Sequence, residues 1–116
     1  NNVGSSKVEC IKLDISKIRY IHLQADVFKK MPNIRYLNFY STFTCGTSHV
    51  HLPKGFKILP NKLSYLVWYG FPLKSLPPTF CAEKLVKLSM PNSHLKKLWN
   101  GVQVCMSLFV FHVFHS

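Results

Sequence analysis

The side chains best suited to chemistry in this chain are its cysteines and histidines, and their spacing matches no established site. Cys45, His49 and His51 fall within one glycine-containing segment and offer three ligands of the kind that zinc prefers. A structural zinc site normally needs four ligands at a recognisable spacing, and no Cys-x-x-Cys pair occurs in the chain. We therefore predict a solvated loop at this segment, with no metal and no cofactor.

Catalytic residues are equally hard to find. The chain has 15 Lys and Arg but only 4 Asp and Glu, which gives a formal net charge of +11. The four acidic residues are scattered along it: Glu9, Asp14, Asp26 and Glu83. No Ser or Cys stands in a nucleophile motif with an identifiable base. We expect that the protein is not an enzyme.

The four cysteines predict the redox environment. Four is an even number, but a disulfide-built domain of this length is usually richer in Cys and Gly. We expect reduced thiols and a cytoplasmic protein, with the nucleus as a second compartment. The apolar stretch 104–114 is too short to span a bilayer as a helix, because about 20 residues are needed.

Aliphatic residues recur in one template, L-x-x-L-x-L-x-x-(N/S/T/F)-x-L, whose positions we number as places 1 to 11. Four segments fit it, starting at Val8, Ile34, Leu63 and Leu85. Starts that are 22 to 29 residues apart are typical of leucine-rich repeats. Because side chains alternate along a strand, places 4 and 6 predict one buried face, and stacked coils then share a core. The predicted core is Ile11, Leu13, Leu37, Phe39, Leu66, Trp68, Leu88, Met90 and Trp99.

The segments between the strands predict returns of different kinds. Residues 26–31 indicate a short helix with Asp26 as N-cap and with Phe28 and Met31 facing inward. Residues 52–61 and 72–80 contain Leu-Pro steps, which favour extended or turn geometry. The predicted fold class is an α/β solenoid of irregular leucine-rich repeats, with short parallel strands on the concave side and extended or short helical returns.

Two details qualify this fold. Place 9, which usually carries Asn, holds other residues, so the turns should be irregular: Ser16, Thr42, Phe71 and Ser93. A small antiparallel β domain would show similar alternation. That alternative has little support, because Asn100-Gly101 is the only hairpin turn signal of its kind in the chain.

A longer motif surrounds the third and fourth repeats. It includes Trp68, Pro72, Leu76-Pro77, Phe80 and Leu98-Trp99. With this motif, residues 59–103 resemble the first leucine-rich repeats of plant intracellular immune receptors of the TIR–nucleotide-binding–LRR type, and residues 8–43 extend the match. The resemblance implies the sensor part of such a receptor, which restrains the nucleotide-binding switch domain and recognises a pathogen effector. No phosphate-binding loop of the G-x-x-x-x-G-K-[ST] kind occurs in the chain.

The predicted organisation has three parts. Residues 1–7 are a linker, and residues 8–103 are leucine-rich repeats of about four coils. Residues 104–116 are a divergent apolar tail. Within that tail Leu108, Phe111, Val113 and Ser116 still fit places 1, 4, 6 and 9, as in a truncated fifth repeat.

Places 3, 5 and 7 should point outward on the concave face. We predict a protein-binding surface there: Lys12, Tyr36, Asn38, Tyr40, Tyr65, Val67, Tyr69, Lys87 and Ser89. Tyr is large and rigid with one polar tip, which suits it to contacts. Tyr36 with Tyr65 and Tyr40 with Tyr69 should form two stacked pairs on adjacent coils. These pairs could instead only stabilise the sheet by cross-strand packing.

These observations favour a protein-interaction module, a truncated repeat fragment of a plant innate-immune receptor that takes part in defence. Its expected partner is the receptor's own nucleotide-binding domain or a pathogen effector, with no specific nucleic acid and no membrane span. The alternative is a small basic protein that binds nucleic acid or an anionic membrane surface. Against it, the lysines are spread along the chain, and Arg19 and Arg35 are the only arginines available for base readout.

Overall fold

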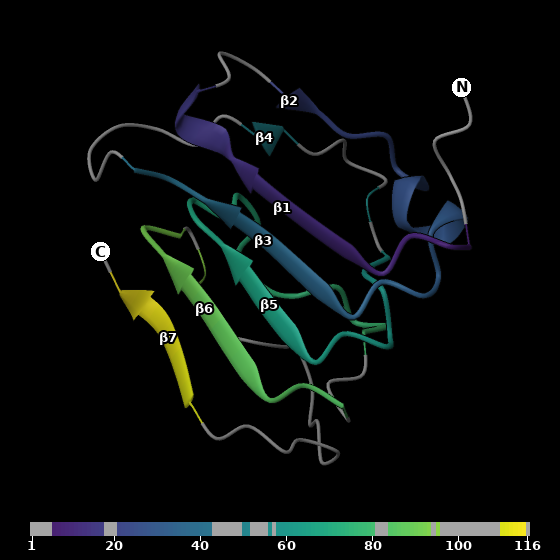
Figure 1. Ribbon diagram of the computed structural model, residues 1–116. Coiled ribbons are helices and arrows are strands. Elements are labelled where there is room, and N and C mark those ends of the chain that lie inside the picture. The colour runs from purple at the N-terminus through teal and green to yellow at the C-terminus, as the bar shows by residue number, and fades with distance from the viewer. Residues whose placement is uncertain are drawn as a thin grey trace.

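The computed structural model describes residues 6–17, 21–42, 50–51, 56, 58–80, 84–93, 95 and 110–115. A parallel sheet with the strand order β1-β3-β5-β6-β7 dominates it (Figure 1). Its strands are β1 (Cys10–Asp14), β3 (Tyr36–Tyr40), β5 (Tyr65–Trp68), β6 (Lys87–Pro91) and β7 (Val110–His115). Every pairing in this sheet is parallel, so the antiparallel alternative is wrong.

The strands pair in the register that the template predicts. Place 4 aligns Ile11 with Leu37, Leu37 with Leu66, and Leu66 with Leu88. β7 continues the series through its backbone, because Phe111 pairs with Leu88 and Val113 with Met90. This is the alignment expected of a fifth repeat, and an irregularity interrupts it only after Met90.

A backbone feature at place 2 recurs at each junction between the first four repeats. The place 2 carbonyl accepts two hydrogen bonds, from the amides of places 2 and 3 in the next repeat. The Glu9 carbonyl accepts from the amides of Arg35 at 2.8 Å and Tyr36 at 3.2 Å. The carbonyls of Arg35 and Ser64 do the same toward the following repeats, at 2.8 to 3.2 Å. These shared bonds join successive strands at their starts and set their common register.

The core lies between the sheet and the segments that return behind it. Places 4 and 6 of the inner strands are buried: Leu37, Phe39, Leu66, Trp68, Leu88 and Met90. In the edge strand β1, Ile11 and Leu13 are half-buried and pack against this cluster. Trp68 has no exposed surface, and three rings meet it edge-to-face, with centroids 4.7 Å away for Phe39, 5.1 Å for Phe71 and 6.5 Å for Phe28.

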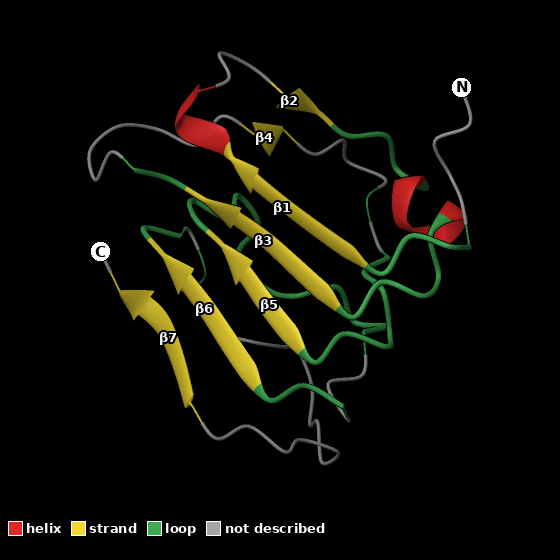
Figure 2. Cartoon of the chain, in the orientation of Figure 1, coloured by secondary structure: helices red, strands yellow, loops and turns green. Residues whose placement is uncertain are grey.

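The returns contain no α-helix among the described residues. Their helical content is two short 3-10 helices, η1 (Ile15–Lys17) and η2 (Val27–Lys30), at opposite ends of the strands (Figure 2). η2 lies where the short helix was predicted, and Phe28 and Met31 are buried as expected. The predicted N-cap is wrong, because the Asp26 side chain makes no capping hydrogen bond and its backbone is at φ −108° and ψ 18°.

A second, two-stranded parallel sheet lies on the return side and was not predicted. It pairs β2 (Ile21–His22) with β4 (Val50–His51), so that His22 aligns with His51. Two-residue strands are too short for alternation to be recognised in sequence. The predicted core residue Trp99 lies outside the described residues. Within the described part of the chain, no helix is long and apolar enough to cross a bilayer.

Trp68→Ala should lower the free energy of unfolding by about 3–5 kcal/mol, because it empties a large and fully enclosed core site. Val67→Ala is the matched control, since Val67 is adjacent in β5 but is only half-buried and points to the other face. Chemical denaturation monitored by circular dichroism measures both. If the two substitutions lowered stability equally, the assignment of faces would be wrong, because a one-residue slip exchanges the faces of a strand.

Candidate protein-interaction face

The outward place 3 residues form one row across four strands. Register pairs Cys10 with Tyr36, Tyr36 with Tyr65, and Tyr65 with Lys87. The rings of Tyr36 and Tyr65 stack with centroids 4.3 Å apart and planes 11° from parallel. The Lys87 ammonium lies 5.2 Å from the centroid of the Tyr65 ring, within cation–π range. One end of the stack thus meets a cation, and at the other end the exposed Cys10 is the register partner of Tyr36.

A second lysine and tyrosine extend this surface toward the strand ends. The Lys12 ammonium lies 5.7 Å from the centroid of the Tyr40 ring. Between the two aromatic positions, the amide nitrogen of Asn38 donates to the Tyr36 hydroxyl at 3.1 Å. We call the five residues Lys12, Tyr36, Tyr40, Tyr65 and Lys87 the tyrosine face. It presents three aromatic rings and two cations.

Two predicted contact residues are less accessible than expected. Asn38 and Ser89 are each only 8% exposed. Both occupy place 5 on inner strands, each of which has a neighbouring strand on both sides. The Oδ1 atom of Asn38 is buried without a hydrogen-bond partner. Asn38 and Ser89 are therefore too buried to serve as main contact residues. Val67, the place 5 residue of the strand between them, is half-buried.

Tyr69 is also not an open contact residue, although place 7 predicted one. β5 ends at Trp68, so Tyr69 already lies in the turn that follows, and its side chain is buried. Its amide donates to the Phe39 carbonyl at 2.8 Å. Its hydroxyl accepts a 3.0 Å hydrogen bond from the side-chain Nδ2 of Asn92, and Asn92 has a left-handed backbone with φ of 58°. The tyrosine pair expected from Tyr40 and Tyr69 is thus replaced by a turn contact.

A hydroxyl bridge joins the first two repeats at place 9. The Ser16 hydroxyl lies 2.8 Å from the Thr42 hydroxyl, and it also donates to the Asp14 carboxylate at 2.5 Å. That hydrogen bond holds the pKa of the Asp14 carboxyl below its ordinary value of 3.8, with help from the Ser16 amide and Lys17 and against some desolvation. Ser and Thr here link neighbouring coils, which is a role that sequence analysis did not assign.

The expectations about metals and cysteines fall largely outside the described residues. Cys45 and His49 are not described, and His51 lies in β4. Within the described ranges, no three His, Cys, Asp or Glu side chains gather as a metal site would require.

Known proteins match this chain over most of its length. A family model described as Leucine Rich Repeat matches residues 84–103. Disease resistance protein RRS1 of Arabidopsis thaliana is 40% identical over 97% of the chain, and Disease resistance protein RPP2A of the same plant is 39% identical over all of it. The chain is similar over most of its length to plant disease resistance proteins, and its residues 84–103 match a leucine-rich repeat. The resemblance inferred from the motif around Trp68 is thereby confirmed.

The match covers only a small part of each relative. This leucine-rich-repeat segment spans 9% of RRS1, 9% of RPP2A and 8% of Disease resistance-like protein DSC1, also from Arabidopsis thaliana. No solved structure matches it. The activities of the full-length relatives are therefore not transferred to this chain. The match shows the repeat pattern and the similarity to defence proteins.

The Asp14–Ser16 hydrogen bond predicts a pH dependence. Because the pKa of Asp14 is lower in the folded chain than its ordinary 3.8, the ionised carboxylate stabilises the fold above that value. This contribution is lost as the pH falls below it, through the lower folded-state pKa. In Ser16→Ala the pKa of Asp14 should rise toward its ordinary value, as followed by carboxyl carbon shifts in NMR titration.

The stability of Ser16→Ala should accordingly fall less steeply than that of the unchanged chain when the pH drops from about 5 to 3. Ser75→Ala, a half-buried serine in a return, is the matched control and should leave the Asp14 titration unchanged. Equal Asp14 pKa values in all three proteins would show that the Ser16 hydroxyl does not hold the carboxylate.

Proposed function

We propose that this segment is a protein-interaction module of a plant defence receptor and that the tyrosine face is its contact surface. The single observation that supports this most is the Tyr36–Tyr65 stack with the Lys87 cation beside it. The proposed partner is the receptor's own nucleotide-binding domain, which the segment would restrain, or a pathogen effector, which it would recognise. In a longer solenoid, the tyrosine face would belong to the concave side.

The composition of this face suits protein contact better than catalysis. Aromatic residues are enriched at interface centres, and cations beside them add directional contacts to carboxylates. The two stacked rings are already held in one orientation, so little side-chain entropy is lost when a partner docks. We also propose that the segment has no enzymatic role and acts in the cytoplasm, with the nucleus as a second compartment.

The Tyr36–Tyr65 stack could instead only stabilise the fold. One series of substitutions separates that structural role from a role in binding. Tyr36→Ala with Tyr65→Ala removes both rings. Tyr36→Phe with Tyr65→Phe keeps the stacked rings and removes the hydroxyls. The chain is co-expressed with the nucleotide-binding domain of a related receptor, and co-precipitation is quantified after circular dichroism shows that each variant is folded.

We expect the alanine pair to weaken co-precipitation at least about tenfold, which is typical for aromatic hot spots, and the phenylalanine pair to weaken it about threefold or less. Lys74→Ala, which changes an exposed lysine in a return, is the control, and it should bind normally. If a folded alanine pair co-precipitated as well as the unchanged chain, the tyrosine face would not be the contact surface.

A further inference from the structure

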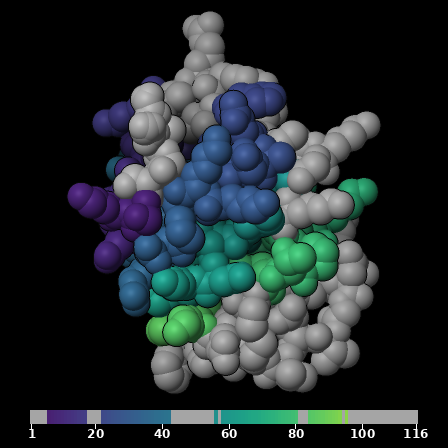
Figure 3. Space-filling view, turned by 90° about the vertical axis from the view of Figure 1, so that its right-hand side faces the viewer, coloured from purple at the N-terminus to yellow at the C-terminus, as the bar shows by residue number. Residues whose placement is uncertain are grey.

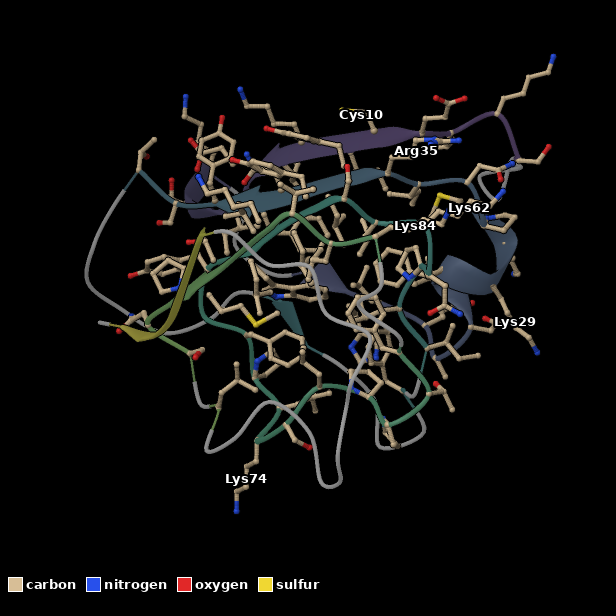
Figure 4. The ribbon with its side chains drawn as sticks, turned by 90° about the horizontal axis from the view of Figure 1, so that it is seen from below. Cys10, Lys29, Arg35, Lys62, Lys74 and Lys84 are labelled. Atoms are coloured by element: carbon tan, nitrogen blue, oxygen red, sulfur yellow. The ribbon has the colours of Figure 1, made fainter. Side chains whose placement is uncertain are left out.

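A second surface lies at the edge of the sheet where the strands begin. Arg35, Lys62 and Lys84 come from three successive repeats, and each stands one to three residues before its strand. All three side chains are exposed. Figure 4 shows them on one side of the molecule, the side that also carries Lys29, whereas Lys74 projects from the return side. We call Arg35, Lys62, Lys84 and the neighbouring Val86 the basic edge.

The fold itself places these cations next to one another. Lys62 and Lys84 occupy the same position, directly before place 1, and Arg35 is at place 2. The shared place 2 carbonyls hold successive strand starts together, and neighbouring strands lie about 4.8 Å apart. The Lys62 ammonium donates to the Asn33 Oδ1 at 2.7 Å, which fixes it along this edge. Figure 3 faces the edge and shows successive repeats side by side.

An apolar side chain stands at the end of this row of cations, two residues after Lys84. Val86 is 45% exposed, and among the described large hydrophobic residues it is the exposed one. It follows Glu9, Arg35 and Ser64 at place 2, where the earlier repeats carry polar side chains. The next residue, Lys87, lies beside the Tyr65 ring, so the basic edge runs directly into the tyrosine face.

The described acidic residues leave the middle of this edge positive. Asp14 is the last residue of β1 and therefore lies at the opposite end of the strands. Glu9 is at place 2 of the first repeat, next to Arg35, so it flanks one end of the edge and leaves Lys62 and Lys84 without an adjacent acidic place 2 residue. Asp26 precedes η2, and Glu83 lies outside the described residues. Three cations from successive repeats therefore call for an acidic partner.

We propose that the basic edge binds an acidic segment of a partner protein that also carries an apolar side chain, which packs on Val86. A phosphate backbone would be served by Arg35, Lys62 and Lys84 but would gain nothing from an exposed valine. Arg, which binds phosphate through two parallel hydrogen bonds, is represented on this edge only once. The mixture of cations with an apolar residue, continuous with aromatic rings, is typical of a protein interface.

The test uses the full chain and three fluorescent probes in anisotropy titrations at low and physiological salt. One probe is a short Glu-rich peptide with two Leu residues, the second has Ser in place of Leu, and the third is a single-stranded DNA with the same number of charges. The variants are Lys62→Gln with Lys84→Gln, and Val86→Ser. Lys17→Gln with Lys74→Gln removes the same charge elsewhere. Circular dichroism establishes that each variant is folded.

We expect the Leu-containing peptide to bind tightest, and the edge lysine pair to weaken it at least about fivefold while the control pair changes it less than about twofold. Val86→Ser should weaken the Leu-containing peptide about threefold and leave the Ser-containing peptide unchanged. Equal losses in the two lysine pairs would show generic polycation binding and overturn the proposal. Tighter binding of DNA, insensitive to Val86→Ser, would overturn it in favour of nucleic acid.

The peptide-binding test of the basic edge is independent of the co-precipitation test of the tyrosine face. The alanine pair at Tyr36 and Tyr65 leaves Arg35, Lys62, Lys84 and Val86 in place. The basic edge could therefore fail its test while the tyrosine face passes, and the reverse could also occur.

Discussion

The structure depends on one backbone interaction that recurs between its repeats, the place 2 carbonyl that accepts two amides of the next repeat. It occurs at Glu9, Arg35 and Ser64 with nearly the same distances each time. A parallel sheet has no tight turn to set its register, because its strands are joined by long returns. These bonds, together with the buried rows at places 4 and 6, supply the register instead. That alignment places Tyr36 beside Tyr65 and Tyr65 beside Lys87.

The apolar packing that stabilises the sheet lies on the other face of the same strands. Place 6 brings Phe39 and Trp68 together, and the returns contribute Phe28 and Phe71 to the same aromatic cluster. Because no described repeat can bury its apolar row alone, each one stabilises its neighbour. The surface rows are rigid for the same reason: a residue at place 3 cannot shift without moving the place 4 residue behind it.

The sequence predicts this alignment well because period-two alternation is a strong signal in strands of four or five residues. This alternation correctly predicted that Tyr36 pairs with Tyr65, that Trp68 is buried in the core, and that Phe111 aligns with Leu88. Prediction failed where the strand ends. Tyr69 fits place 7 in the template, but β5 stops at Trp68, and the left-handed Asn92 of the next repeat binds the tyrosine hydroxyl.

Other features depend on contacts between segments far apart in sequence. The bridge from Ser16 to Thr42 requires two hydroxyls from different repeats, and no local pattern reveals it. The pairing of β2 with β4 involves only two residues on each side. Asn38 and Ser89 are buried although both are polar and occupy place 5. Template position predicts which way a residue points, but not how much of it a partner can reach.

The register can be tested directly through the exposed thiol of Cys10, which is paired with Tyr36 across β1 and β3. Backbones of neighbouring strands are close enough for a disulfide when the two side chains share a face. Under mild oxidation, Tyr36→Cys should therefore cross-link to Cys10, as detected by peptide mass mapping, while Arg35→Cys, one residue out of register, should not. Cross-linking of Arg35→Cys in preference to Tyr36→Cys would contradict the alignment on which both proposed surfaces depend.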